Sequence, residues 1–321
     1  MIKKEFIWEK QGLIFAPDNN FDWMSDYAQN PSSIILNDRI RVFFNCRPKK
    51  DKNGYFSSYI AYVDLDINNL FSIINISKKP LLEHGSKGCF DEHGTMCGNV
   101  VEYKNNYYMY YVGWQRLQSV PYTHSIGLAI SKDNCDNFEK IGKGPVISKT
   151  VNEPFLQNSP FISIINKKFQ MWYSSGLEWV EENNKDESIY LIMHSESEDG
   201  INWQRNGVPI IETVVDFETQ TNPSVIEIDG IYHMWFCYRH GKDFRNKNRG
   251  YKIGYAYSED LINWKRDDKL GANIPLSEKG WDSEMLCYPY VIEYNKNILM
   301  FYSGNFFGRD GFGYAILKDY K

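Results

Sequence analysis

The stretch "GWDSEMLCYPYVIEYNKNILMFYSGN", residues 280–305, contains the pattern that decides the fold. It has an apolar strand, a short polar turn and an aromatic strand, which is typical of a β-hairpin. The same pattern occurs four more times along the chain. The other copies are "NPSSIILNDRIRVFFNCRP" (30–48), "GNVVEYKNNYYMYYVGW" (98–114), "SPFISIINKKFQMWYSSG" (159–176) and "NPSVIEIDGIYHMWFCYRHG" (222–241).

Each copy has an equivalent anchor residue near the start of its first strand. The anchors are Pro31, Gly98, Pro160, Pro223 and Pro289, at intervals of 67, 62, 63 and 66 residues. A third strand recurs as "SIGLAISKDNCDNF", "YLIMHSESEDGINW" and "KIGYAYSEDLINW", and a fourth as "FEKIGKGPVI" and "WQRNGVPII". A four-stranded unit with this period predicts an all-β propeller, and five anchors predict five blades of four antiparallel strands.

The two ends of the chain predict how the ring closes. The fifth unit ends with its third strand, "FGYAILKDYK", while the N-terminal "WEKQGLIFAP" resembles the fourth strand "WQRNGVPII". We therefore expect Trp8–Phe15 to pair with Gly313–Leu317, so that residues 1–321 form a single propeller domain without a long open edge. A two-domain β-sandwich, the alternative, explains neither the regular anchors nor this swapped strand.

The composition of the chain limits the kinds of molecule that it is expected to bind. A net charge of −5 without a basic stripe argues against nucleic acid. No stretch is long and apolar enough for a signal peptide or a membrane span, which predicts a cytoplasmic protein. The six cysteines lack CxxC or metal-ligand spacing, so we expect reduced, mostly buried thiols, no catalytic metal and no cofactor. A structural calcium or sodium ion in the channel is still possible, because the carboxylates described next could bind one.

Residues just before the anchors and at the ends of the second strands should meet at one mouth of the channel. Acids recur seven or five residues before the anchors, and arginines, Trp or Asn recur sixteen residues after them. The predicted catalytic residues are Glu284, Asp282, Asp91, Glu153 and Glu218, and the predicted substrate-binding residues are Asp26, Arg47, His93, Trp114, Arg239 and Asn305. Acids and aromatic rings suit a sugar, and arginines suit phosphate or another anion.

Two of these acids lie two residues apart, so in an extended segment both should point towards the mouth. Trp281-Asp282 repeats the Phe90-Asp91 pattern, which gives Asp282 the larger structural share and makes Glu284 more specific to the site. We expect the pair to couple, with Arg239 as the nearest cation. The alternatives are that the acids bond to loop amides as part of the blades, and that the arginines only neutralise the ring of acids.

The repeats resemble the five-bladed propellers of glycoside hydrolase families 43, 32 and 130. The resemblance covers nearly the whole chain and is closest to family-32/43-like propeller proteins of bacterial surface-polysaccharide gene clusters. The specific pieces are "FDEHG", "VGWQ", "VPYTHSIGLAIS", "FCYRHG", "GWDSEMLCYP" and "GNFFGRDGFGYA", whereas "MWY" and "DGINW" are generic. The resemblance implies an activity on glycosides.

The chain departs from the hydrolase pattern where the catalytic Asp is expected. Asn30-Pro31 stands in place of the Asp-Pro motif, and "RDP" and "EC" motifs are missing. Asn-Pro pairs and mouth arginines are more similar to family 130, which includes mannoside phosphorylases. Two functions stay open: a carbohydrate-active transferase, phosphorylase or hydrolase that uses a glycoside, sugar phosphate or sugar nucleotide, and a glycan-binding or scaffolding propeller that has lost its chemistry.

Overall fold

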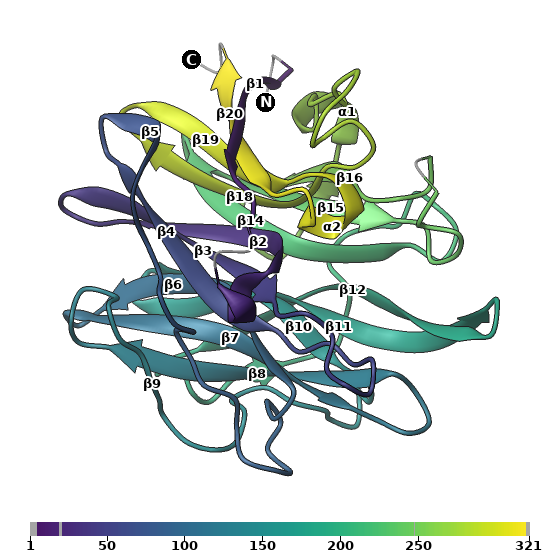
Figure 1. Cartoon of the computed structure of the whole chain (residues 1–321). Helices are drawn as coiled ribbons and strands as arrows, with labels where there is room; N and C mark the ends of the chain where they lie inside the picture. The colour runs from purple at the N-terminus through teal and green to yellow at the C-terminus, as the bar shows by residue number, and fades with distance from the viewer. Residues whose placement is uncertain (1–4, 19–20, 247, 319–321) are drawn as a thin grey trace.

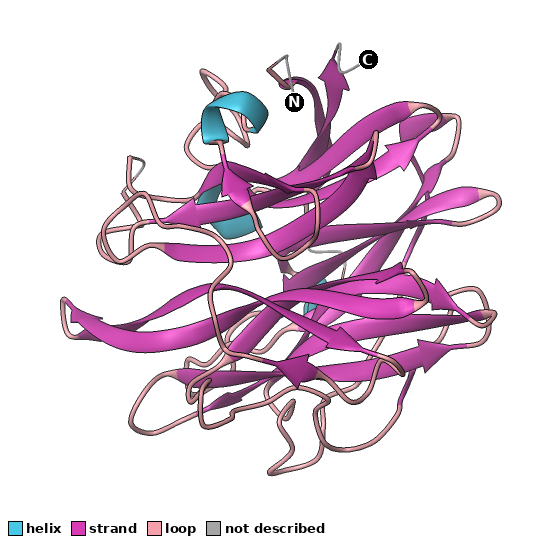
Figure 2. Cartoon of the chain, turned by 180° about the vertical axis from the view of Figure 1, so that it is seen from behind, coloured by secondary structure: helices cyan, strands magenta, loops and turns pink. Residues whose placement is uncertain are grey.

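The computed structural model describes residues 5–18, 21–246 and 248–318. Within these residues, twenty strands form five antiparallel sheets of four strands each. The sheets are arranged as the blades of a ring, with the first and the last strand of the chain side by side in the blade that closes it (Figures 1 and 2). The predicted all-β five-bladed propeller is therefore confirmed.

The blades share one strand order. The first strands are β2 (Asp26–Ile35), β6 (Gly94–Tyr103), β10 (Gln157–Ile165), β14 (Thr219–Ile228) and β18 (Cys287–Tyr294). The second strands are β3 (Arg39–Arg47), β7 (Asn106–Arg116), β11 (Lys168–Glu182), β15 (Ile231–Arg239) and β19 (Asn297–Ser303). The third strands are β4 (Tyr59–Asp66), β8 (Tyr122–Ser131), β12 (Lys185–Ser197), β16 (Lys252–Ser258) and β20 (Phe312–Lys318). The fourth strands are β5 (Asn69–Ile76), β9 (Glu139–Lys140), β13 (Gln204–Arg205), β17 (Lys265–Arg266) and β1 (Ile7–Phe15). Three short helical turns, η1 (Asp22–Met24), α1 (Asp268–Gly271) and α2 (Asn305–Gly308), lie in loops between strands.

The five first strands surround the centre of the ring. Each contacts the first strand of the next blade, in the order β2, β6, β10, β14, β18 and back to β2. Pairing with the second strand slips at each anchor, and in four blades the residue before the anchor has a left-handed backbone: Asn30, Ser159, Asn222 and Tyr288, with φ between 49° and 57°. Such bulges re-aim side chains, here beside the start of each inner strand.

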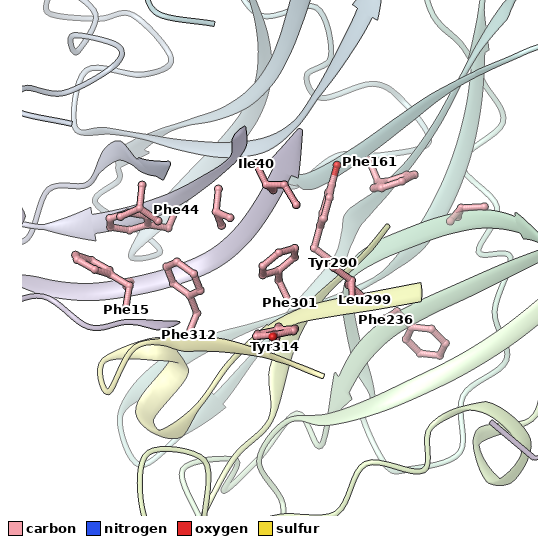
Figure 3. Packing of buried hydrophobic residues seen from close by; sticks show 14 of the residues in the cluster. Phe15, Ile40, Phe44, Phe161, Phe236, Tyr290, Leu299, Phe301, Phe312 and Tyr314 are labelled. Atoms are coloured by element: carbon pink, nitrogen blue, oxygen red, sulfur yellow. The ribbon is translucent and has the colours of Figure 1, made fainter. Parts of the chain in front are cut away.

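The N-terminal strand closes the ring as predicted. β1 pairs antiparallel with β20, with Trp8 opposite Leu317 and Leu13 opposite Gly313. The ring of Phe15 packs against that of Phe44 in the first blade, with 5.0 Å between the ring centroids (Figure 3). The closing strand therefore joins the last blade to the first.

Blade three differs from the others in the length of its second hairpin. β11 continues to Glu182, six residues beyond Gly176, the position equivalent to Arg47 and Arg239. Asn183 and Asn184 turn the chain with φ of 50° and 57°, the conformation of a two-residue hairpin loop. The hairpin therefore projects past the ends of the neighbouring second strands, on the side that carries the predicted mouth.

All six cysteines are free thiols, and five of them are buried, in agreement with the prediction of reduced, mostly buried cysteines. Among the described residues there is no helix with the length and apolar character needed to cross a membrane.

Candidate functional site

Three of the predicted catalytic acids occupy the same kind of buried cluster inside their blades. In each cluster a tyrosine of the second strand donates its hydroxyl hydrogen to the carboxylate, and a cation of the fourth strand lies beside it. The clusters are Asp91 with Tyr111 (3.0 Å) and Lys140, Glu153 with Tyr173 (2.9 Å) and Arg205 (3.5 Å), and Asp282 with Tyr302 (2.9 Å) and Lys10 (2.7 Å). Burial raises the pKa of each tyrosine, so the hydroxyls stay protonated and donate.

Glu218 forms the fourth such cluster with different partners. Arg266 of β17 lies 2.6 Å from its Oε1, and Gln220 donates to the same oxygen at 2.8 Å. The backbone N–H groups of Val214 and Val215 donate to Oε2. A carboxylate with this many donors is fully satisfied by the protein itself.

Differences between the blades show that acid and tyrosine belong together. In blade one the two equivalent positions hold Met24 and Phe44, both buried and apolar. In blade four Phe236 replaces the tyrosine, and Asp216, at the position equivalent to Asp91, is exposed. A buried acid at this position therefore occurs only where a tyrosine can donate to it, which is what a blade-internal contact requires.

A sequence signal could have revealed these clusters. Each cation stands two residues after an aromatic residue at the start of a fourth strand. The four pairs are Phe138 and Lys140, Trp203 and Arg205, Trp264 and Arg266, and Trp8 and Lys10. This repeat places the fourth strands, but its spacing alone does not pair the cations with the acids. Whether these acids also act on a substrate stays a prediction.

The expectations for Asp282 and Glu284 need two corrections. The nearest cation to Asp282 is Lys10 of the closing strand, not Arg239. The two side chains also do not point the same way, since Asp282 is 2% exposed whereas Glu284 is an exposed residue. The reason is that Asn305 accepts hydrogen bonds from the N–H groups of Glu284 and Met285, which bends this segment away from an extended course. Asn305 thus shapes the loop through its backbone contacts.

Arg47, His93 and Trp114 are brought together at the mouth between blades one and two. The guanidinium of Arg47 lies 4.5 Å from the ring of Tyr27 and 5.2 Å from that of Phe56. Arg116, which the sequence analysis missed, donates to the carbonyl oxygen of Phe56. We call Arg47, Phe56, His93, Trp114 and Arg116 the blade 1–2 cluster.

The contacts of Arg116 connect this cluster. Its guanidinium lies 4.6 Å from the ring of Tyr55 and 5.7 Å from that of Trp114. Its backbone N–H donates to Nδ1 of His93 at 3.3 Å, and burial together with Arg116 lowers the pKa of this histidine. Within the described part of the chain, neither Arg47 nor Arg116 has a carboxylate within 4.0 Å. Two cations therefore stand beside aromatic rings without a carboxylate in direct contact, and the charge of Arg116 also acts on Asp51, whose pKa is lowered chiefly by the backbone N–H of Tyr55.

Asp26 lies at the start of β2, with its Cα opposite that of Arg47 in the strand register. It is half-buried, and its Oδ1 accepts from the N–H of Tyr27 at 3.2 Å. In the described residues it makes no ion pair. Asp26 is thus a mouth carboxylate without an ion-pair partner among the described residues.

Arg239 lies in a second cluster, between blades three, four and five. It is 4% exposed, and its guanidinium lies 3.6 Å from the ring of Phe244, with Tyr251 at 5.5 Å and Tyr190 at 6.0 Å. Close by, Tyr122 stacks on His124, whose pKa burial lowers to about 3, so this imidazole is neutral. The predicted substrate-binding residues therefore fall into two groups rather than one.

The arrangement offers hydrogen bonds and stacking surfaces for a sugar and cations for an anion, and it offers little to a metal. No group of three or more His, Cys, Asp or Glu residues in the described ranges could hold a metal ion.

No family model matches the chain. Two proteins of Mycobacterium tuberculosis, MT1551 (strain CDC 1551 / Oshkosh) and Rv1502 (strain ATCC 25618 / H37Rv), are each 33% identical to it over 314 residues, which is 97% of this chain and 99% of theirs. The β-1,2-mannobiose phosphorylase of Thermoanaerobacter sp. (strain X514) is 26% identical over 157 residues, 46% of this chain and 49% of that protein.

Solved structures of glycoside-active propellers share the fold. A family-130 structure, from a study of mannoside phosphorylases and hydrolases that target β-1,2-mannosidic linkages in Candida mannan, has a TM-score of 0.70 at 16% identity, covering 97% of this chain and 94% of its own. A thermostable family-43 glycoside hydrolase has a TM-score of 0.63 at 17% identity, covering 94% and 91%. The family-32 β-fructofuranosidase BmSUC1 of Bombyx mori has a TM-score of 0.61 at 15% identity, covering 98% and 61%. The resemblance to the propellers of families 43, 32 and 130 is confirmed at the level of the fold.

Proposed function

The chain belongs to the same family as the mycobacterial proteins MT1551 and Rv1502, and we propose that it is a glycoside-active enzyme that transfers a glycosyl group to or from phosphate. The substrate is a glycoside or a sugar phosphate bound at the mouth between blades one and two. The free cysteines fit the reducing cytoplasm that we propose as its location.

The blade 1–2 cluster carries this proposal. In the described part of the chain, Arg47 and Arg116 have no carboxylate partner; they lie beside Phe56, Tyr55 and Trp114 and are half-buried. A guanidinium presents two parallel donors that match the oxygens of a phosphate. The aromatic rings offer the apolar surface on which a sugar ring can rest.

Attack by phosphate requires one carboxylic acid in the site, whereas attack by water requires two carboxyl groups. The site therefore favours phosphate over water as the attacking group. A glycosidase uses two carboxylates about 5–5.5 or 6.5–9.5 Å apart, and the four acids inside the blades are already bonded to tyrosines and cations. With phosphate, one of its oxygens attacks the anomeric carbon, the glycosidic C–O bond breaks, and one carboxylic acid gives its proton to the leaving oxygen. We assign that proton to Asp26, with Glu284, which makes no ion pair among the described residues, as a second candidate.

The partial similarity to a β-1,2-mannobiose phosphorylase supports this reaction class, although it covers less than half of the chain. It also suggests the first compounds to test. We propose a mannoside, or another glycoside with a hydroxyl group beside the anomeric carbon, as the first compound to test.

The second candidate function is a glycan-binding propeller without catalysis. It is favoured by one observation: every buried acid inside a blade has partners that satisfy it without a ligand. In that case the blade 1–2 cluster would hold an anionic sugar but release it unchanged.

Phosphorolysis can be tested directly. The protein is incubated with β-1,2-mannobiose and a panel of other disaccharides, with and without orthophosphate, and glycosyl phosphate is followed by phosphorus NMR. We expect phosphate-dependent product, lost in Asp26→Asn and reduced at least about tenfold in Arg47→Gln, since a hydrogen bond to a charged group contributes roughly 1.5–3 kcal/mol. Release of free sugar without phosphate would indicate hydrolysis, and binding without product would indicate the glycan-binding alternative.

A further inference from the structure

Arg239 differs from the other large buried arginines of the protein. Arg41 donates to both carboxylate oxygens of Asp64 at 2.7 and 2.9 Å, and Arg266 pairs with Glu218 and Asp268. Arg239 is as buried as these, yet no carboxylate lies within 4.0 Å of it in the described ranges. Its recorded hydrogen bonds go to the carbonyl oxygen of His240, at 2.9 Å, and to the hydroxyl of Tyr251.

A buried guanidinium with so few acceptors is costly to the protein unless something else satisfies it. Aromatic rings compensate part of the cost, and Phe244 and Tyr251 both contact this cation. An arginine has five N–H donors, and in the described residues two of those of Arg239 meet a protein acceptor. The hydroxyls of Tyr190 and Tyr251 lie 2.8 Å apart, so one donates to the other and the second keeps its hydrogen for a ligand. A guanidinium with spare donors beside two tyrosine hydroxyls matches a small oxyanion.

The cover over Arg239 comes from the loop of residues 240–246, which carries Phe244. Two contacts fasten this loop to the long hairpin of blade three. Arg245 pairs with Glu187 at 2.7 Å, and the N–H of Asp243 donates to Glu182 at 2.7 Å. The Arg245 side chain is 58% exposed, and an exposed ion pair of this kind contributes little to stability. The cover is therefore fastened by contacts that are easy to break.

We propose that Arg239, Tyr190 and Tyr251 form a second anion-binding pocket, which takes the carboxylate or phosphate group of an acidic sugar and is covered by the loop of residues 240–246. The extended part of the blade-three hairpin, residues 177–188, is the latch that holds the loop down. This pocket is distinct from the blade 1–2 cluster and does not depend on the phosphate transfer proposed there. It gives the long hairpin, which the other four blades lack, a function.

Stability separates this idea from a structural role for Arg239. Arg239→Met removes a cation that leaves no anion behind, so we expect a midpoint of thermal unfolding, Tm, equal to or above that of the wild type. Arg266→Met is the matched control, because it strands Glu218, and we expect its Tm to fall by at least about 5 °C. An equal fall in both variants would mean that Arg239 is needed for the fold, which would overturn the proposal.

Binding is then measured by calorimetry on the full chain, with glucuronic acid and glucose 1-phosphate as probes and glucose as the neutral control. We expect one acidic sugar to bind at least tenfold more tightly than glucose, and the tighter of the two identifies the anionic group. Arg239→Met should abolish that preference, whereas Arg47→Gln should leave a detectable part of it. Glu182→Gln combined with Glu187→Gln should speed association by loosening the latch. The proposal fails if the preference survives in Arg239→Met, or if it vanishes only in Arg47→Gln, and that second result would leave the phosphate site of blades one and two intact.

Discussion

The interior of the blades and the mouth of the propeller treat charge in opposite ways. Inside the blades, four carboxylates each meet a cation from the fourth strand, and three of them also accept from a tyrosine. At the mouth, Arg47, Arg116 and Arg239 have no carboxylate partner in the described residues. A ring of acids in a sequence is therefore not by itself a catalytic ring. Charges that neighbours already satisfy build the blades, and unsatisfied ones are left for a ligand.

The largest effect is expected from removing the closing strand. Deleting residues 1–16 exposes the edge of β20, removes the buried rings of Phe6, Trp8 and Phe15, and strands Asp282. At about 1.5–3 kcal/mol for each buried ring, we expect the free energy of unfolding to fall by more than about 5 kcal/mol, measured by chemical denaturation. A truncation of residues 1–4 alone is the control, and an unchanged midpoint after the longer deletion would contradict ring closure by this strand.

Breaking an acid cluster ranks next. Glu218→Gln leaves Arg266 in a buried site with a weaker partner, and we expect a loss of about 3 kcal/mol in the free energy of unfolding. Asp282→Asn should cost less, because Lys10 is partly exposed and keeps some contact with water. If either variant kept its stability but lost ligand binding, the acids would belong to the site and not to the blade.

Blade one suggests how the charged cluster of blade five could be replaced by apolar residues. The triple variant Asp282→Met, Tyr302→Phe, Lys10→Met gives blade five the apolar residues that blade one has at Met24 and Phe44. Replacing a whole buried polar cluster by apolar side chains is often neutral, whereas removing one member is not. We therefore expect the triple variant to be more stable than Asp282→Met alone. Greater instability would show that blade five needs its charges.

A smaller effect concerns pH. His233 is buried beside Tyr255, whose hydroxyl lies 2.6 Å from Nδ1, and burial lowers the pKa of this histidine to about 4. In the unfolded chain the imidazole has an ordinary pKa near 6.5, so between these values the unfolded state binds a proton that the folded state refuses. Stability should therefore be complete above about pH 6.5 and fall as the pH drops towards 4, by at most about 1.4 kcal/mol per pH unit. Chemical denaturation of His233→Gln at pH 7 and pH 5 should show a smaller difference than in the wild type.

The smallest stability change is expected at the mouth. Arg47→Gln removes a half-buried cation that no acid needs, so the free energy of unfolding should change by less than about 0.5 kcal/mol. A loss comparable to that of Glu218→Gln would remove the contrast between the two regions.

The fold could be predicted from the sequence because a propeller repeats its unit. The anchors, the hairpins and the N-terminal fourth strand can each be recognised from a local sequence pattern. Their regular spacing along the chain then predicts a ring of five blades. The partners of the acids were harder to obtain, because the repeated aromatic residue two positions before a cation marks the fourth strands without saying which acid each cation meets. Lys10 and Asp282 are far apart in the chain and meet only because the ring closes, so their contact follows from tertiary structure. Similarly, the bend at Glu284 depends on a hydrogen bond from its N–H to the side-chain oxygen of Asn305, which cannot be predicted from residue spacing.

The most direct test of this account is the position of a bound phosphate analogue in a crystal of the protein, located by the anomalous signal of tungstate. We predict tungstate at the mouth, within hydrogen-bonding distance of the guanidinium groups of Arg47 and Arg116. Tungstate bound instead beside Lys140, Arg205, Arg266 or Lys10, with the neighbouring acid displaced, would show that the blade clusters are the site and would contradict the account.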